Sequence, residues 1–263
     1  MRNEAETTVD YEVDDGIAHI HLNRPHRLNA VVPQLVEDLC QALGEAEKDG
    51  VGAAILAGRG RAFCAGHDLR HEEPPITEAD HRRRLQRIQD VTRKVRRAPY
   101  AVVSSVHGYA LGAGCEFALC SDIIVAERDA EFGFPEVGVG LSITGGISHI
   151  LPVTVGLARA KELVLFGARF GAEEAERLGL INRVVGSGER ENTALEMAWV
   201  LRDRPRMALS LAKFALDRGA QSSIEAAYEV EVEHALATQR SADAQQAVEA
   251  FRQKLGSATK EEG

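Results

Sequence analysis

Short runs of aliphatic and β-branched residues alternate with longer amphipathic segments along the first half of the chain. The strand-like runs are residues 17–22, 52–57, 100–106 and 123–125. The segments with helical spacing are residues 31–48 and 79–97. In the first of these, Leu35, Leu39 and Leu43 share one face of the predicted helix, and most acidic side chains lie on other faces. Strands that alternate with such helices predict an α/β core.

The C-terminal part of the chain has a different pattern, because from about residue 158 onward it is almost wholly helical. The predicted helices are residues 159–166, 172–178, 192–201, 206–218, 222–237 and 242–254. Ahead of this part, residues 132–135 predict a turn, since glycine and proline alternate there with two phenylalanines. We expect two regions, a core at residues 1–195 and a helical region at residues 196–263.

The composition excludes several classes of protein. With 263 residues, of which 44% are hydrophobic, the chain is long enough to bury a full core. Its net charge of −9 opposes nucleic-acid binding, which needs a cationic face. No apolar run approaches the roughly 20 residues of a membrane-spanning helix, and the polar, acidic N-terminus lacks the pattern of a signal peptide. We therefore expect a cytoplasmic protein with no membrane or nucleic-acid partner.

Cysteines and arginines add two local expectations about ligands. The four cysteines lack the paired spacing of a metal site, and three lie inside apolar runs, so we expect reduced thiols and no bound metal. The arginine-rich stretch at residues 82–97 has two interpretations. We favour the solvated face of a long helix, and the alternative is a cationic surface for an anionic ligand such as a phosphorylated cofactor.

Two glycine-rich segments, residues 60–69 and residues 106–116, each come directly after a strand-like run. Glycines at a helix start allow unpaired N–H groups to point at an anion or a developing oxyanion. Taken alone, the first segment is better explained as an ordinary strand-to-helix turn. A dinucleotide-binding fold is disfavoured for the second, because residues 112–114 lack the third glycine of that motif.

Two glutamates lie in apolar, glycine-rich surroundings. Glu116 ends the second glycine segment and begins an apolar helical run, and Glu136 follows Pro135. Burial of an ionised carboxylate is costly and raises its pKa, which suits the group to proton transfer. The alternative for Glu116 is a structural carboxylate that backbone N–H groups near the helix start satisfy. As a pair, the two glutamates indicate acid/base chemistry.

In these motifs the sequence resembles the enoyl-CoA hydratase/isomerase (crotonase) superfamily. The matching positions lie, in order, within residues 21–30, 63–69, 108–116, 121–123, 132–146, 151–167 and 172–182. The resemblance covers nearly the whole chain, and several motifs in the right order are more specific than any one of them. It implies an α/β fold, a spiral of repeated ββα units, with a C-terminal helical region that forms homotrimers or homohexamers.

The resemblance also implies a reaction on acyl-coenzyme A thioesters. The thioester carbonyl accepts hydrogen bonds from the backbone N–H groups of His67 and Ala113, which form an oxyanion hole. Glu116 and Glu136 match the two catalytic glutamates of the hydratase branch, where water adds to a trans-2-enoyl-CoA. We assign Glu116 to the water and Glu136 to the α-carbon proton. Coenzyme A enters as part of the substrate, and no prosthetic group is implied.

By the same resemblance, coenzyme A lies along the end of one strand and the first glycine segment. The expected contacts are Arg24, Ala65, His67, Asp68 and Leu69. Arg24 also has a plain interpretation as a surface residue at a strand end. Phe251 and Lys254 are further candidates, because C-terminal helices complete a neighbour's cofactor site in some members of the family.

Several positions depart from the usual family pattern. His67 replaces a residue that is often small, and its imidazole either lines the acyl pocket, contacts the cofactor or faces solvent. Ala113 replaces a common glycine, which is harmless at negative φ and costly at positive φ. Four polar side chains follow Glu136, and we favour helix caps over pocket residues for them. They are Ser142, Thr144, Ser148 and His149.

We therefore predict an enoyl-CoA hydratase. The first alternative is an enoyl-CoA isomerase or another acyl-CoA enzyme of the crotonase type. The second is a non-catalytic acyl-CoA or RNA-binding module that has kept the fold. The presence of both glutamates favours hydration over these alternatives.

Overall fold

The computed structural model describes residues 7–71 and 76–261, with side chains up to residue 253 in these ranges. The chain divides into two compact units between Arg202 and Asp203. The sequence places the boundary after residue 195, which lies inside helix α7 (Arg190–Arg202). Ala194 and Ala198 of α7 are fully buried in a cluster with strand residues of the first unit, and we therefore describe the whole helix with that unit.

Within the described residues, the first unit is built on a sheet of six strands in the order β1-β2-β3-β4-β6-β9. The strands are β1 (Val9–Asp14), β2 (Ile17–Leu22), β3 (Ala53–Gly58), β4 (Ala101–Val106), β6 (Ile123–Glu127) and β9 (Arg183–Val185). β1 and β2 form an antiparallel hairpin, and the other neighbouring strands are parallel. The predicted α/β core is confirmed. The sequence pattern missed β1, whose residues are mostly polar and of which only Val9 is buried, and β9, which is only three residues long.

Alternate residues of the sheet point to opposite faces and contact different helices. On one face, Ile17, Ile55 and Val103 form a cluster with the buried alanines of α7. On the other face, Ile20 and Leu56 join the main core, to which helix α1 (Pro33–Lys48) contributes its apolar side. The leucines that the helical spacing placed on one face of α1 are all buried, namely Leu35, Leu39 and Leu43.

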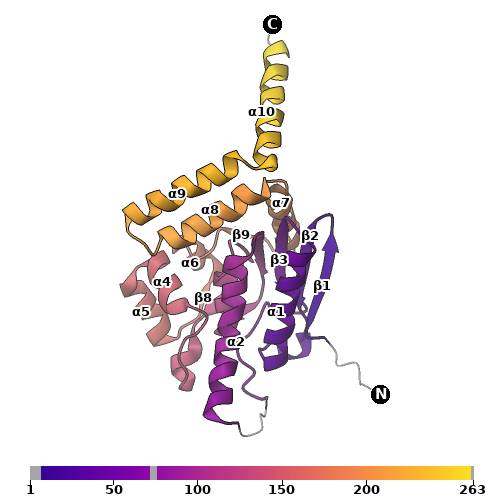
Figure 1. The fold of residues 1–263 in the computed structure, drawn as a ribbon. Coiled ribbons are helices and arrows are strands. Elements are labelled where there is room, and N and C mark those ends of the chain that lie inside the picture. The colour runs from indigo at the N-terminus through magenta and orange to yellow at the C-terminus, as the bar shows by residue number, and fades with distance from the viewer. Residues whose placement is uncertain (1–6, 72–75, 262–263) are drawn as a thin grey trace. The chain divides into compact units, whose positions relative to one another are not determined.

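Helix α2 (Glu78–Arg97) packs beside α1 (Figure 1). It begins with a capping box, in which Thr77 and Asp80 exchange hydrogen bonds. Arg82, Arg83 and Arg93 form exposed ion pairs with acidic residues of their own helix, so this part of the arginine-rich stretch is a solvated face, as the favoured interpretation expects.

A small second sheet carries the segments next to the two glutamates. In the described part of the chain it consists of β5 (Tyr109–Leu111), β7 (Glu131–Gly133) and β8 (Phe170–Gly171). The predicted turn at residues 132–135 is wrong in its first half, because Phe132 and Gly133 pair in parallel with Ala110 and Leu111. A strand of three residues contains too little alternation for the sequence pattern to reveal it.

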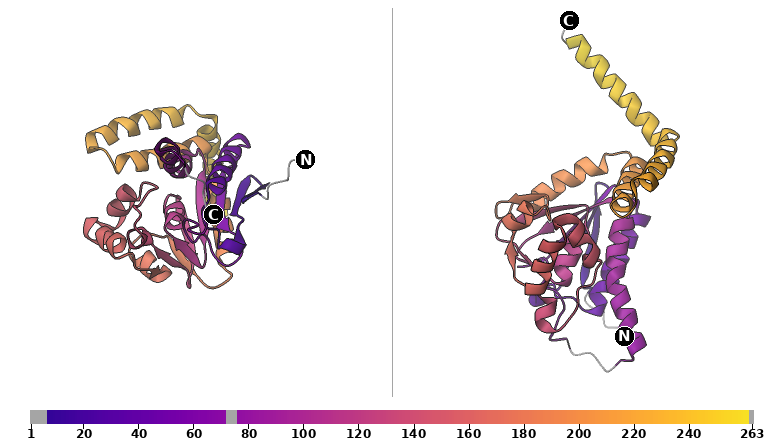
Figure 2. Two further views of the ribbon diagram at one scale, coloured as in Figure 1. Left: turned by 90° about the horizontal axis from the view of Figure 1, so that it is seen from below. Right: turned by 90° about the vertical axis from the view of Figure 1, so that its left-hand side faces the viewer.

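Short helices complete the first unit. They are η1 (Pro25–Arg27), α3 (Ala113–Leu119), η2 (Pro135–Val139), α4 (Ile147–Val155), α5 (Leu157–Phe166) and α6 (Ala172–Arg177). Helices α4 and α5 pack together as a pair (Figure 2). The sequence pattern missed α4, which contains Pro152 and follows two glycines.

The second unit contains the helices α8 (Arg206–Gly219), α9 (Ile224–Gln239) and α10 (Ala242–Glu261). These correspond to the three last helices of the sequence prediction, and α8 packs against α9. Several large apolar side chains of this unit are exposed, among them Phe214, Tyr228 and Val232. Assembly through this unit stays a prediction.

All four cysteines are buried and free, which agrees with the expectation of reduced thiols. No three side chains of the metal-binding types lie together as a ligand set in the described residues. Of the helices described, none combines the length and apolar character that a membrane span requires.

Candidate active site

The two glycine-rich segments of the sequence lie side by side, because backbone hydrogen bonds join them. Cys64 forms a parallel bridge with Ala110. The Cys64 N–H donates to the Tyr109 carbonyl at 2.8 Å, and the Leu111 N–H donates to the Cys64 carbonyl at 3.0 Å. At Gly66, φ is +89°, and a Cβ would lie 2.8 Å from the Leu111 carbonyl oxygen. Only glycine fits there, so the two segments stay in close contact beyond the bridge.

This contact sets the backbone amides of His67 and Ala113. Val31 forms a parallel bridge with His67, and its hydrogen bonds use the Gly66 carbonyl and the Asp68 N–H. In an extended segment the N–H groups of successive residues point to opposite sides. Because the Asp68 N–H points toward Val31, the His67 N–H points away from it. Ala113 is the first residue of α3, where an N–H has no acceptor within the helix. Ala113 is not among the residues with positive φ, so its Cβ carries no backbone strain.

Glu116 lies one turn into α3 and is 1% exposed. Both of its carboxylate oxygens accept hydrogen bonds from Thr144, Oε1 from the backbone N–H at 2.7 Å and Oε2 from the hydroxyl at 2.8 Å. Burial raises the pKa of the Glu116 carboxyl group, and the two hydrogen bonds oppose that rise. The backbone N–H that satisfies Glu116 thus comes from a distant loop and not from the helix start.

Glu136 lies in η2 and is 6% exposed. Its Oε2 is buried and accepts no hydrogen bond from the described residues. Burial raises the pKa of the Glu136 carboxyl group; a hydrogen bond from its own backbone N–H lowers it, and the negative charge of Glu116 raises it further. A Cβ on Gly112 would lie 2.9 Å from Oε1 of Glu136, so this carboxyl group lies directly against the residue that precedes Ala113.

The two carboxyl groups therefore differ in environment while they share one site. The hydrogen bonds from Thr144 favour the ionised form of Glu116, whereas the unpartnered oxygen of Glu136 favours the protonated form. Burial raises the pKa of both carboxyl groups, and hydrogen bonds from a neighbouring residue oppose that rise only at Glu116. The arrangement is suited to moving a proton at each of two adjacent substrate atoms.

Arg24 is directed into the protein and not toward solvent. Its guanidinium pairs with Asp68 at 3.1 Å and also donates to the carbonyl of Ala30, and only 14% of its side chain is exposed. The plain interpretation of Arg24 as a surface residue is therefore wrong. Burial opposes the ionisation of Asp68, but hydrogen bonds from Arg24 and from the Arg70 N–H hold its pKa below the ordinary value. Arg24 thereby fixes the segment that carries His67.

Of the other expected coenzyme A contacts, Ala65 and Leu69 lie in this segment. The Ala65 N–H donates to the Leu28 carbonyl at 3.0 Å, and Leu69 is 70% exposed. Phe251 is an exposed residue of the second unit. The side chain of Lys254 lies outside the described residues.

The helix-cap interpretation of the polar residues after Glu136 is wrong. Helix α4 begins at Ile147 with Gly146 as its N-cap, and no side chain caps it. Thr144 bonds Glu116 instead, and the other three side chains, Ser142, Ser148 and His149, are exposed.

A cavity of about 660 Å³ lies beside His67, between α1, α2 and the first glycine segment. Its aliphatic lining comes from Val31, Val32, Pro33, Val36, Leu69, Leu85, Ile88 and Leu141. His67 is one of the residues that line this cavity. Arg84 and Arg87 line it too, so one part of the arginine-rich stretch faces a cavity. His71 and His81 also line the cavity, and they belong to the segment at residues 70–81 from which the sequence predicts pocket residues.

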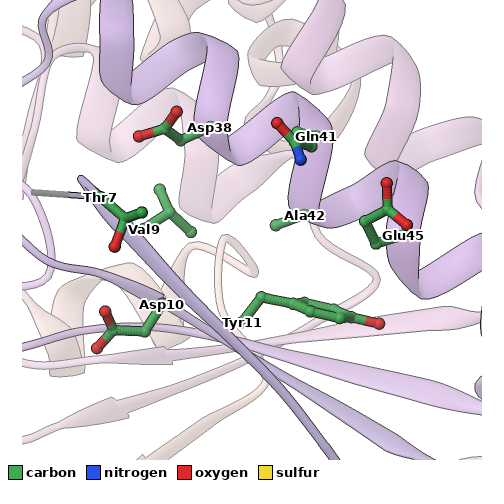
Figure 3. Close-up of a pocket in the computed structure, with 8 residues that line it drawn as sticks. All are labelled: Thr7, Val9, Asp10, Tyr11, Asp38, Gln41, Ala42 and Glu45. Carbon is green, nitrogen blue, oxygen red and sulfur yellow. The ribbon is translucent and has the colours of Figure 1, made fainter. Parts of the chain in front are cut away.

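A second cavity, of about 440 Å³, lies between β1 and α1 and is separate from this site. Figure 3 shows its lining, with Val9, Asp10 and Tyr11 on the strand side and Asp38 and Glu45 on α1. None of Glu116, Glu136, His67 and Ala113 lines it. Two of its carboxylates are already engaged, since Asp38 accepts hydrogen bonds from Thr8 and Asp10 pairs with Arg59.

Comparison with known proteins identifies relatives that cover most of the chain. The protein is 36% identical to a short-chain-enoyl-CoA hydratase of Clostridium acetobutylicum, over 84% of this chain and 85% of that protein. It is 33% identical to a 1,2-epoxyphenylacetyl-CoA isomerase of Escherichia coli, over 91% of this chain and 93% of that protein.

Solved structures agree with these relatives. The crystal structure of an enoyl-CoA hydratase from Mycobacterium smegmatis is similar with a TM-score of 0.88 and 31% identity, over 95% of this chain and 97% of that one. An enoyl-CoA hydratase from Bacillus anthracis is similar with a TM-score of 0.88 and 29% identity, over 94% and 96%. The crotonase fold predicted from the sequence motifs is thereby confirmed. Since the family model for enoyl-CoA hydratase/isomerase also matches residues 12–261, the chain belongs to the enoyl-CoA hydratase/isomerase family.

Proposed function

We propose that this protein is an enoyl-CoA hydratase that adds water across the double bond of a trans-2-enoyl-CoA. The observation that carries the proposal is the pair of buried carboxyl groups, one held by two hydrogen-bond donors and the other with an unpartnered oxygen. An enzyme that adds water needs a base for the water and an acid for the α-carbon. Glu116 and Glu136 have the environments that these two roles require.

In the proposed reaction, ionised Glu116 accepts a proton from water as the water oxygen attacks the β-carbon. The π electrons of the double bond shift to the α-carbon, and negative charge develops on the thioester oxygen. The amides of His67 and Ala113 donate hydrogen bonds to that oxygen, which contribute about 3 kcal/mol each to transition-state stabilisation. Protonated Glu136 delivers its proton to the α-carbon. A proton passes from Glu116 to Glu136 through solvent exchange to restore the starting state.

The cavity beside His67 is the proposed site of the acyl chain. Its largely aliphatic lining suits a hydrocarbon tail, and its volume of about 660 Å³ exceeds that of a short acyl group. Because His67 lines this cavity and also supplies one amide of the proposed oxyanion hole, the acyl chain and the thioester carbonyl contact the same residue in this proposal. Arg24 supports coenzyme A binding indirectly, through the segment it fixes.

Loss of the 2-enoyl absorbance tests the proposal. Purified protein is mixed with crotonyl-CoA and with a longer 2-enoyl-CoA, and the wild type is compared with Glu116→Gln and Glu136→Gln. Removal of a general acid or base lowers the rate by about 10²–10⁴-fold, so hydration is expected to collapse in both variants. Activity that survives in either variant at the wild-type rate contradicts the two-glutamate mechanism.

An enoyl-CoA isomerase is the second candidate, because the family model that matches the chain is named for both enoyl-CoA hydratases and enoyl-CoA isomerases. A double-bond shift uses one carboxyl group and no water. Product analysis separates the two reactions: a hydratase gives a 3-hydroxyacyl thioester from the 2-enoyl substrate, whereas an isomerase consumes a 3-enoyl thioester. Turnover of the 3-enoyl substrate alone overturns the hydratase proposal.

A further inference from the structure

Thr144 contacts Glu116 through two different groups at once. Its backbone N–H donates to Oε1 at 2.7 Å and its hydroxyl donates to Oε2 at 2.8 Å. The residue comes from the loop before α4, 28 positions away in the chain. Its own carbonyl accepts the Ile147 N–H, so the loop is fixed to the start of α4 by a hydrogen bond of 3.0 Å.

We propose that Thr144 is a positioning residue for Glu116, which keeps the carboxylate ionised and holds both oxygens in one orientation toward the water. This inference rests on the proposed hydration. Each carboxylate oxygen has two lone pairs, and Thr144 uses one on each oxygen. One lone pair per oxygen therefore remains available to a substrate water. A backbone N–H can only donate, so its bond to Oε1 favours the ionised form.

Gly145 confines Glu116 from the neighbouring position. Its φ is +57°, and a Cβ there would lie 2.8 Å from Oε2 and 2.9 Å from Cβ of Glu116. The loop backbone therefore lies in close contact with the whole side chain. Because Thr144 bonds both oxygens while Gly145 occupies the adjacent space, rotation of the carboxylate breaks two hydrogen bonds and meets the loop.

The pH dependence of kcat/KM distinguishes positioning from a merely structural role. The Thr144→Val variant keeps the shape of the side chain and the backbone N–H but removes the hydroxyl donor. The ionised form of Glu116 then loses one hydrogen bond, so its pKa rises. Since the base must be ionised, the acidic limb of the profile is expected to move to higher pH by about one unit. The Thr144→Ser variant keeps the hydroxyl and is expected to restore the wild-type limb.

A matched control is Thr154→Val in α4. Thr154 is exposed, and its hydroxyl bonds the Ile150 carbonyl of its own helix at 3.0 Å. The same substitution there is expected to leave the profile unchanged. An acidic limb that stays in place in Thr144→Val, or that moves equally in Thr154→Val, overturns the proposal.

Carbon-13 NMR titration of labelled glutamate carboxyl groups provides a readout that does not need turnover. The Glu116 resonance is assigned by its disappearance in Glu116→Gln. The pKa of the Glu116 carboxyl group is then measured in wild type and in Thr144→Val, each at the same interval below its own Tm. A rise in the variant supports the role of Thr144 even if no 2-enoyl substrate is hydrated, in which case only the proposed function fails. An unchanged pKa overturns the role of Thr144 even if hydration is rapid.

Discussion

Arg24 and Asp68 form an ion pair of 3.1 Å that links the end of β2 to the segment carrying His67. The side chains are 14% and 6% exposed, so water does little to replace the partner that either one loses. The pair thus connects the main sheet to one of the two proposed oxyanion-hole amides. Its loss is expected to affect both stability and substrate binding.

The Arg24→Gln variant is expected to lower the free energy of unfolding by about 2 kcal/mol, because it leaves the Asp68 carboxylate buried without its charged partner. Urea unfolding measures this change. Arg59→Gln is the matched control, since Arg59 pairs with Asp10 at 3.2 Å but the side chains are 48% and 35% exposed. An exposed pair contributes less than about 1 kcal/mol. Equal losses in the two variants would show that burial of the first pair has no energetic consequence.

The Ala113→Pro variant tests the second amide. Proline lacks the N–H donor, and the first position of a helix is where its ring is best tolerated. Loss of one oxyanion-hole donor lowers kcat by about 10²–10³-fold, so hydration is expected to fall by that factor while the circular dichroism spectrum is retained.

Ala172→Pro serves as its control, because Ala172 is likewise a buried first residue of a helix that follows glycine. It is expected to retain most of the activity. A comparable loss of kcat in the control assigns the effect to backbone distortion and contradicts the donor role of Ala113.

The Gly145→Ala variant is expected to displace the carboxylate of Glu116. The added Cβ meets Oε2 at 2.8 Å, and φ at this position is +57°. Gly179→Ala carries a similar backbone cost at φ +74°, but a Cβ there meets nothing within 4 Å. Both variants are expected to lose about 1–2 kcal/mol of stability, and only Gly145→Ala to lose kcat as well. The same kcat in Gly145→Ala and Gly179→Ala would contradict the view that close contact with Gly145 positions the carboxylate of Glu116.

The Glu136→Gln variant is expected to be more stable than the wild type at neutral pH. Burial raises the folded-state pKa of Glu136 above its ordinary value of 4.5, so the folded protein binds a proton that the unfolded chain releases. Wild-type stability therefore falls as pH rises from the unfolded pKa through the folded pKa. Glutamine does not ionise, so it causes no such pH-dependent loss of stability. The stability gain of Glu136→Gln therefore disappears near pH 4, where residue 136 of the wild type is largely protonated in both the folded and the unfolded state.

Urea unfolding at both pH values measures this difference. Glu131→Gln is the control, because Glu131 lies on the adjacent β7 in an exposed ion pair. A stability gain in Glu136→Gln that persists unchanged at low pH assigns the gain to packing and not to the buried carboxyl group.

Hydrophobic spacing predicted the long elements of the fold, because Leu35, Leu39 and Leu43 repeat at a helical period that burial requires. It missed β7, where Phe132 and Gly133 are held by pairing with a strand that is itself only three residues long. Tertiary contacts create such an element, so the local sequence contains little signal for it.

The burial of the two glutamates could be predicted from the sequence, but the side-chain hydrogen bonds around them could not. The apolar surroundings of Glu116 and Glu136 indicated burial, which the structure has. The hydrogen bonds from Thr144 were not predictable, because a polar residue before a helix is ordinarily a cap and nothing local indicates that its hydroxyl faces a carboxylate 28 positions away. The ion pair of Arg24 with Asp68 was missed for the same reason.

The bridge between Cys64 and Ala110 has a consequence for how this scaffold diversifies. Main-chain pairing sets the separation of the two glycine segments, so replacement of side chains around them leaves the spacing of the amides unchanged. The carboxyl groups are supplied by α3 and η2, and much of the cavity lining comes from α1 and α2. Evolution can therefore exchange the carboxyl groups or the cavity walls supplied by these helices one at a time, while the main-chain framework that joins the two glycine segments stays in place.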